Sequence, residues 1–209
     1  MEVISEFFHR LGNLEELIRW GGLVVLIIIV FAETGLMIGF FLPGDSLILT
    51  AGLLAATGKY FSISELIICL IFAAIIGDNT GYWFGRKAGP GLFKKKDSKL
   101  FKKAYLIKAG EFYEKHGGKT IIYARFIPFA RTFAPIVAGI TQMPYKKYIG
   151  YSVSGGILWI SSMSLIGYYF GSIPFIKDNF EKVIILIILL SVSPVIIGWI
   201  KSRREKKRS

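Results

Sequence analysis

Four charged residues stand inside the apolar stretches of this chain, where a charge is costly. They are Glu33, Asp45, Arg125 and Arg131. An unpaired charge in hydrocarbon costs on the order of 3 kcal/mol by insertion scales, so an intramembrane ionisable group is by default a candidate for function. Arginine presents a planar fork of donors that suits phosphate, and a carboxylate in a low dielectric takes up a proton more readily than in water. The four residues therefore indicate a site that binds a phosphate and handles protons.

Asp45 and the two arginines lie beside a proline turn, and Glu33 interrupts the first apolar stretch ahead of that turn. A Pro-Gly pair directly precedes Asp45, and another proline lies between the two arginines. We expect each broken stretch to form a re-entrant hairpin, with the two tips meeting in one buried polar chamber. Arg125 and Arg131 would then bind substrate, and Glu33 and Asp45 would couple transport to protons. The alternative is that the four residues are ion pairs that only hold the hairpins together.

Asp78 and Asn79 form a second polar pair, near one end of the next apolar run. They either hydrogen-bond a neighbouring helix or line a polar pathway out of the site, and the sequence favours neither. Three glycines are expected to allow close packing of helices: Gly139, Gly155 and Gly156. Three tryptophans are expected at the membrane interface or in packing contacts: Trp83, Trp159 and Trp199.

The remaining reactive side chains indicate neither a metal centre nor an enzyme. The two histidines, His9 and His116, lie far apart in polar segments, and the single cysteine, Cys69, sits in an apolar run. A metal site or a nucleophile with its base needs such groups at suitable spacing. We therefore expect no catalytic residue, no metal and no cofactor. A membrane-embedded lipid-phosphate phosphatase is an alternative that this pattern disfavours.

The composition places these residues in a membrane protein. The chain has 209 residues, 53% of them apolar, and a net charge of +12; its mean hydropathy is +0.54. Nineteen of the 26 Lys and Arg residues lie in 86–119, at 146–147 and in the last nine residues. These blocks flank apolar runs, which is typical of cytoplasmic loops rather than of nucleic-acid binding. We expect one multi-pass domain in the inner or plasma membrane, with a cytoplasmic C-terminus.

The first half of this single membrane domain (1–209) divides into four segments. Residues 1–20 have apolar residues at helical spacing and predict an amphipathic helix on the membrane. Residues 22–57 predict the first re-entrant hairpin, because their two clean limbs of 11 and 12 residues are shorter than the roughly 20 that a span needs. Residues 63–84 predict a spanning helix, and 86–119 a cytoplasmic basic segment.

The second half repeats this order and adds a further helix. Residues 120–147 predict the second hairpin, 148–170 and 183–200 predict spanning helices, and 201–209 form a basic tail. Two strings recur between the halves: FLP at 41–43 returns as FIP after 85 residues, and GYWFG at 81–85 returns as GYYFG after 86. Agreement in order and spacing favours an internal repeat.

One full crossing separates the two hairpins, so we expect the repeats to be inverted in the membrane, as in many secondary transporters. The predicted fold is an all-α polytopic membrane protein. It consists of an inverted repeat of surface helix, re-entrant hairpin and spanning helix, followed by a C-terminal spanning helix.

The motifs around the charged residues resemble those of the DedA family. They are Glu33 with Phe41-Leu42-Pro43-Gly44-Asp45 after it, the run from Gly77 to Arg86, and Arg125-Phe126-Ile127-Pro128-Phe129-Ala130-Arg131 with Gly139 and Met143 beyond. The resemblance covers about residues 20 to 200, and the string YARFIPFAR is a fairly specific part of it. Members of that family are bacterial and archaeal inner-membrane proteins, and the related VTT-domain proteins of eukaryotes are lipid scramblases.

The resemblance implies recycling of polyprenyl-phosphate carriers, such as undecaprenyl phosphate, from the outer to the inner leaflet. It also implies dependence on the proton-motive force, and roles in envelope integrity and in resistance to cationic peptides. The family's essential acids fall on Glu33 and Asp45, and its essential arginines on Arg125 and Arg131. Some members have Glu at the position of Asp45.

The function we expect is therefore translocation of a lipid phosphate between leaflets. The expected partners are the membrane lipid and protons, with no nucleic acid, and assembly into a homo-oligomer is left open. The alternative is a proton-coupled transporter of a small solute, which would use the same acids but enclose its substrate. A deep cavity closed to lipid would favour the solute, and a groove open to the bilayer would favour the lipid.

Overall fold

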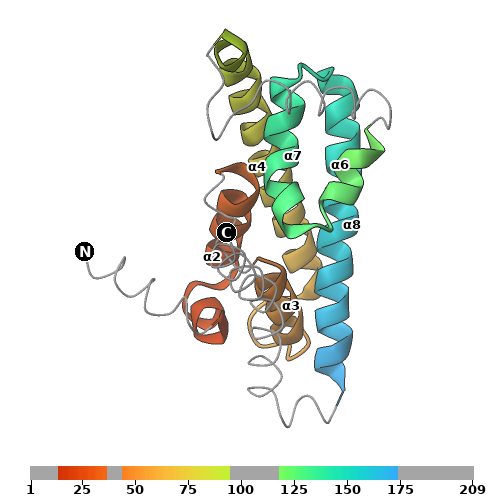
Figure 1. The fold of residues 1–209 in the computed structure, drawn as a ribbon. Helices are drawn as coiled ribbons and strands as arrows, with labels where there is room; N and C mark the ends of the chain where they lie inside the picture. Colours follow the sequence, from red (N-terminus) through yellow and green to blue (C-terminus); the bar gives the residue numbers. More distant parts are fainter. Residues whose placement is uncertain (1–13, 37–43, 95–117, 174–209) are drawn as a thin grey trace, which may run out of the picture.

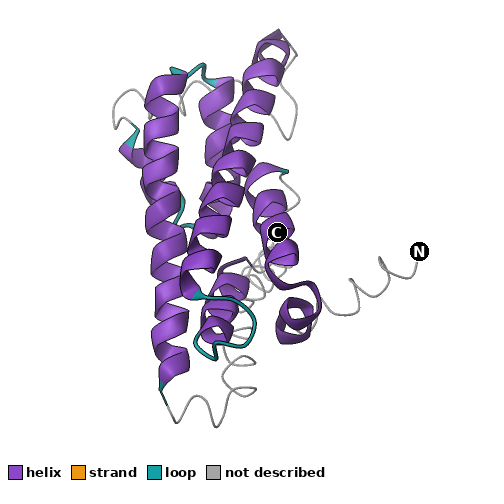
Figure 2. Cartoon of the chain, turned by 180° about the vertical axis from the view of Figure 1, so that it is seen from behind, coloured by secondary structure: helices purple, strands orange, loops and turns teal. Residues whose placement is uncertain are grey.

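The computed structural model describes residues 14–36, 44–94 and 118–173, and every regular element within these ranges is a helix (Figure 2). The helices are α2 (Leu14–Gly35), α3 (Gly44–Ala55), α4 (Ile63–Lys94), α6 (Lys119–Ala124), α7 (Pro128–Ile140) and α8 (Tyr145–Ser172) (Figure 1). Three of them are long and apolar enough to cross a membrane: Glu16–Gly35, Ile63–Gly89 and Tyr145–Ser172. The all-α polytopic fold is confirmed. The span expected at 183–200, the basic tail and most of the basic segment lie outside the described residues.

The helix α2 bends at Gly22 and then continues past the first buried acid. Gly22 has φ 54° and ψ −145°, a conformation that glycine adopts more readily than any other residue. The bend coincides with the change from surface helix to membrane segment expected near residue 21. Beyond the bend, the helix continues through Glu33 and ends at Gly35, although we expected the helical limb to end before Glu33. The stretch of 20 residues from Glu16 is thus longer than the limb of 11 residues that we expected.

The helices α4 and α8 are the long axis of the molecule and run in opposite directions along it (Figure 1). α4 extends to Lys94, ten residues beyond the expected end of its span. α8 covers Tyr145–Ser172, close to the expected 148–170.

Two short helices form a hairpin beside α8. α6 descends from the end at which α8 begins, and α7 returns to that end, so that the turn at residues 125–127 lies near mid-height (Figure 1). α6 has 6 residues and α7 has 13, and neither reaches the roughly 20 that a span needs. Pro128 begins α7, where its missing N–H is not needed by the helix. The re-entrant course of this hairpin and the inverted repeat stay predictions.

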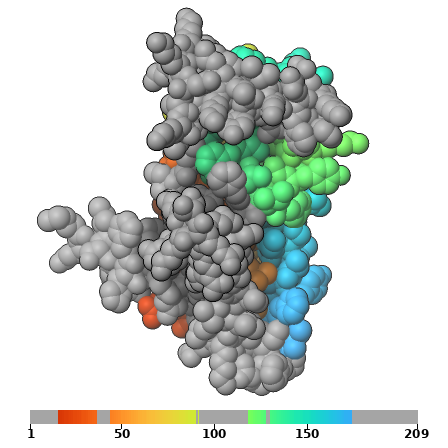
Figure 3. Space-filling view, in the orientation of Figure 1, coloured from red at the N-terminus to blue at the C-terminus, as the bar shows by residue number. Residues whose placement is uncertain are grey.

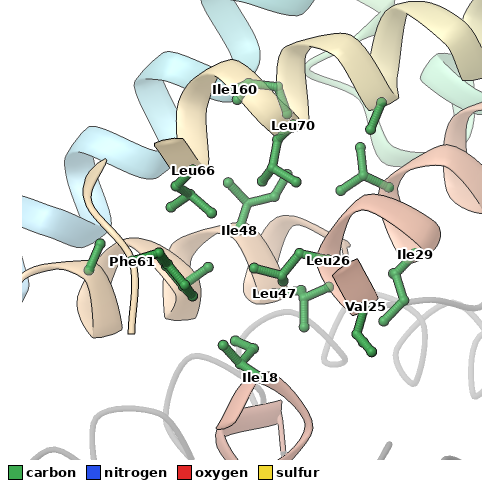
Figure 4. Packing of buried hydrophobic residues seen from close by; sticks show 14 of the residues in the cluster. Ile18, Val25, Leu26, Ile29, Leu47, Ile48, Phe61, Leu66, Leu70 and Ile160 are labelled. Atoms are coloured by element: carbon green, nitrogen blue, oxygen red, sulfur yellow. The ribbon is translucent and has the colours of Figure 1, made fainter. Parts of the chain in front are cut away.

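The core lies where α2, α3, α4 and α8 meet. It contains Leu26 from α2, Leu47 and Ile48 from α3, Leu70 from α4 and Ile160 from α8, each at most 1% exposed (Figure 4). Lipid tails are as apolar as these side chains, so close van der Waals packing rather than escape from water holds such helices together.

Glycines bring the backbones of neighbouring helices into contact. A Cβ atom on Gly52 of α3 would lie 3.0 Å from the backbone nitrogen of Tyr168 in α8. A Cβ atom on Gly139 of α7 would lie 2.7 Å from the backbone nitrogen of Arg86 in α4. The backbone oxygens of Ser164 and Tyr82 lie closer still to these two Cβ positions, nearer than real side chains come, so only glycine permits this approach. The close packing predicted for Gly139 is confirmed.

Candidate functional site

Arg131 is the hub of a buried ionic cluster at the ends of three helices. It lies in the first turn of α7, with Glu33 near the end of α2 and Asp45 in the first turn of α3. Its Nη1 donates to Asp45 Oδ1 over 2.5 Å, and its Nη2 donates to Glu33 Oε1. The side chains of Arg131 and Glu33 are 5% and 1% exposed, against 32% for Asp45. The structure thus brings together three of the four charges that the sequence singled out.

Trp159 completes this cluster from α8. Its indole N–H donates to Asp45 Oδ1 over 2.9 Å, and the Arg131 Cζ atom lies 4.5 Å from the centroid of its ring. That distance is within the range of a cation–π contact. Trp159 is fully buried, so it contacts the carboxylate and the guanidinium at once. We expected an interface or packing residue here, and a single tryptophan in an apolar run gives no signal for this role.

Arg125 does not join the acids of the first hairpin. It caps the C-terminus of α6, and its Nη2 donates to Asp78 Oδ2 in α4. The Ser152 hydroxyl in α8 donates to the same Asp78 oxygen over 2.5 Å and lies 3.4 Å from Arg125 Nη2. Tyr148 donates to the backbone carbonyl of Asp78 over 2.8 Å. The expectation that both arginines face the same two acids is therefore corrected: each has its own carboxylate partners.

Two glycines of α8 make room for Arg125. A Cβ atom on Gly155 would lie 3.0 Å from Arg125 Cδ, and one on Gly156 would lie 3.4 Å from Arg125 Nη1. The sequence predicted that these glycines allow helices to pack closely, but their nearest neighbours include the guanidinium and its stem. They therefore form one wall of a socket for the Arg125 side chain.

Asn79 and Tyr82 connect α4 with the start of α8. Tyr145 donates to Asn79 Oδ1 over 2.8 Å, so Asn79 makes the interhelical hydrogen bond that was one of its two expected roles, and the polar pathway stays a prediction. Tyr82 is fully buried and stacks on Tyr148 with ring centroids 4.4 Å apart. Its hydroxyl donates to the backbone carbonyl of Met143 over 2.6 Å, inside the protein.

Several buried polar atoms of this site have no hydrogen-bond partner among the described residues. They are Glu33 Oε2, Arg125 Nε and Nη1, and Arg131 Nε. Gly44 lies against the Glu33 carboxylate, so closely that a Cβ atom there would overlap it. Buried polar groups are nearly always satisfied by protein, water or a ligand.

Within the described part of the chain, no group of His, Cys, Asp and Glu could hold a metal ion.

Comparison with known proteins gives consistent matches over the chain. Residues 42–169 match the VTT domain family model. The chain is 43% identical over 211 residues to "Protein DedA" of Escherichia coli strain K12, covering 99% of this chain and 96% of that protein. It is 42% identical over 185 residues to an uncharacterized membrane protein of Mycobacterium tuberculosis strain H37Rv, covering 88% and 81%. It is 31% identical over 174 residues to the inner membrane protein YghB of Escherichia coli strain K12, covering 83% and 79%. No solved structure matches the chain.

Proposed function

Because this chain belongs to the DedA family of VTT-domain proteins and is a multi-pass membrane protein, we propose that it moves a polyprenyl-phosphate lipid between leaflets. The lipid class is that of undecaprenyl phosphate, and the movement is coupled to the proton-motive force. One observation carries the proposal: Arg131 is held by two carboxylates from different helices at a junction of helix ends. A phosphate that binds Arg131 must compete with both.

This competition couples phosphate binding to protons. With both acids ionised, Glu33, Asp45 and Arg131 together carry one negative charge, which repels a phosphate. Protonation of the two carboxylates leaves Arg131 as the single charge of the cluster and weakens their hold on its N–H groups. A carboxylate buried in low dielectric is the kind of group that accepts such a proton. Phosphate would then take the donors that the acids release, and loss of the protons would expel it.

The surroundings of the arginines favour a lipid over an enclosed solute. Three large side chains within two residues of Arg125 in the sequence are exposed: Tyr123 by 69%, Phe126 by 45% and Ile127 by 56%. In the space-filling view, α6 lies at the molecular surface on this side (Figure 3). Apolar side chains exposed beside buried arginines suit a substrate whose charged head enters while its tail stays in the bilayer. We also propose that the protein is not an enzyme, since moving a phosphate past Arg131 requires no covalent step.

The test is leaflet exchange in reconstituted vesicles. Purified protein is placed in vesicles that contain labelled polyprenyl phosphate, and the label reaching the opposite leaflet is followed with and without a pH gradient. Wild type should exchange the lipid faster under the gradient, and Arg131→Ala should not exceed protein-free vesicles. Lys147→Ala is the matched control, because Lys147 is an exposed cation near the start of α8. Equal exchange by wild type and Arg131→Ala would overturn the proposal, whereas proton flux driven by a small solute without lipid exchange would support the solute transporter.

A further inference from the structure

Arg125 lies in a socket formed by Asp78, Ser152, Gly155 and Gly156, and Arg131 has no such socket. This difference between the two arginines supports an inference that goes beyond the proposed function. Arg125 is 3% exposed and Asp78 is 2% exposed, so neither charge is relieved by solvent. We propose that Asp78, with Ser152, is the positioning residue of Arg125. The pair fixes the guanidinium in one orientation and keeps its remaining N–H groups available for the lipid phosphate. The transport role of Asp78 rests on the proposed function, whereas the pairing itself does not.

The first step of the argument is the construction of the socket. Asp78 comes from α4, and Ser152, Gly155 and Gly156 come from α8. Asp78 accepts from Arg125 Nη2 through Oδ2, and the same oxygen accepts from the Ser152 hydroxyl. The two glycines lie against the stem and the guanidinium. Arg125 thus has one carboxylate partner with a second donor on the same oxygen, whereas Arg131 is shared between two carboxylates, Glu33 at the end of α2 and Asp45 at the start of α3.

The second step is the set of donors that the socket leaves open. Asp78 occupies Nη2, while Arg125 Nε and Nη1 are buried and have no hydrogen-bond partner among the described residues. A buried guanidinium with open N–H groups is an unfavourable arrangement unless water or a ligand completes it. An arginine that is fixed and only partly satisfied is suited to receive an anion, because little conformational freedom remains to be lost on binding.

The third step separates Asp78 from the proton-coupled acids. The titratable side chains that contact Asp78 in the described structure are Arg125 and Tyr148, and Asp78 does not contact Arg131. We therefore assign Asp78 to Arg125 as its counter-ion, outside the Arg131 cluster, and give it no part in carrying the transported proton. Its loss should lower the rate of exchange without changing how that rate depends on pH. Loss of Glu33 or Asp45 should change the pH dependence itself.

The functional experiment measures exchange of labelled polyprenyl phosphate in vesicles across a series of pH values. Asp78→Asn keeps the shape of the side chain and removes its charge, and it should lower the rate by about tenfold or more by the same factor at every pH. Ser152→Ala should also lower the exchange rate, by a smaller factor than Asp78→Asn. Thr80→Ala is the control on the same helix, since Thr80 is exposed and bonds only within α4. A shifted pH profile, or an unchanged rate, for Asp78→Asn overturns the proposal.

A second experiment tests the pairing without any substrate. Thermal unfolding in detergent is compared for Asp78→Asn, Arg125→Gln and the double variant, and for Asp78→Asn combined with Arg131→Gln. The loss of stability in the Asp78→Asn/Arg125→Gln double variant should be smaller than the sum of the losses in its two single variants. For Asp78→Asn combined with Arg131→Gln the losses should add, because these two residues share no contact. Additivity for Asp78 and Arg125 overturns the pairing. Wild-type vesicles without lipid exchange would overturn the proposed function and the transport role of Asp78, whereas the unfolding cycle would still decide the pairing.

Discussion

Replacing Arg131 by glutamine should destabilise the protein mainly through the acid it leaves behind. The side chain of Glu33 is 1% exposed and that of Asp45 is 32% exposed. Breaking a buried ion pair by removing one partner costs about 3–5 kcal/mol; this applies to Glu33, whose hydrogen-bond partner among the described residues is Arg131, whereas Asp45 keeps the Trp159 N–H as a donor. The loss should therefore come almost entirely from Glu33. At about 2–4 °C per kcal/mol for a chain of this size, the unfolding midpoint should fall by about 6–20 °C.

The assay is thermal unfolding in detergent micelles, followed by circular dichroism, for Arg131→Gln alone and with one acid neutralised. Adding Glu33→Gln should recover most of the lost midpoint, because no buried charge then remains unpaired at that position. Adding Asp45→Asn should recover little, because without Arg131 this carboxylate still accepts the hydrogen bond from the Trp159 indole N–H. Lys147→Gln provides the control for loss of an exposed positive charge. Equal recovery by the two neutralisations, or an Arg131→Gln midpoint equal to that of the control, would refute the reasoning.

Two further outcomes can be measured on the same protein. Trp159→Phe keeps an aromatic ring but removes the N–H bond to Asp45, so it should cost about 1.5–3 kcal/mol and lower the unfolding midpoint; an unchanged midpoint would show that this bond contributes nothing. After Cys69→Ala, the single-cysteine variants Lys59→Cys and Lys147→Cys report orientation, because both positions are exposed. Lys59 precedes the first residue of α4, and Lys147 lies at the start of α8, which contacts α4 at Asn79 and Tyr82, near the other end of its apolar part. A membrane-impermeant maleimide should label Lys59→Cys from outside and Lys147→Cys from the cytoplasm. Labelling of both from one side would contradict a crossing by α4.

The short sequence signals were sufficient to find the ionic cluster around Arg131. A charge inside an apolar run stands out by itself, and the proline turns beside Asp45 and before Arg131 predicted helix ends close to them. The structure places Asp45 in the first turn of α3 and Arg131 in the first turn of α7. Helix ends are where charged side chains from separate segments can meet, so the local pattern implied the meeting of these residues.

The same signals did not reveal the socket of Arg125. Arg125 pairs with Asp78, 47 residues away, and Trp159 bonds to Asp45 over 114 residues. No periodicity or motif joins such positions, because their distance depends on how α4 and α8 pack against the hairpin. Gly155 and Gly156 show the same limit: a glycine in a membrane helix indicates a close approach, but the sequence does not say whether a backbone or a guanidinium approaches.

The sequence alone determined that the chain is a helical membrane protein with four costly charges in its apolar stretches, three of them beside proline turns, because hydropathy, helix-breaking residues and the cost of burying a charge are properties of single residues and short segments. Only the tertiary structure decided which carboxylate each arginine contacts, that Trp159 belongs to the cluster, and that Arg125 has one carboxylate partner while Arg131 is shared between two. Those assignments depend on ångström-scale distances between side chains far apart in the chain, and these are set by the packing of whole helices against one another.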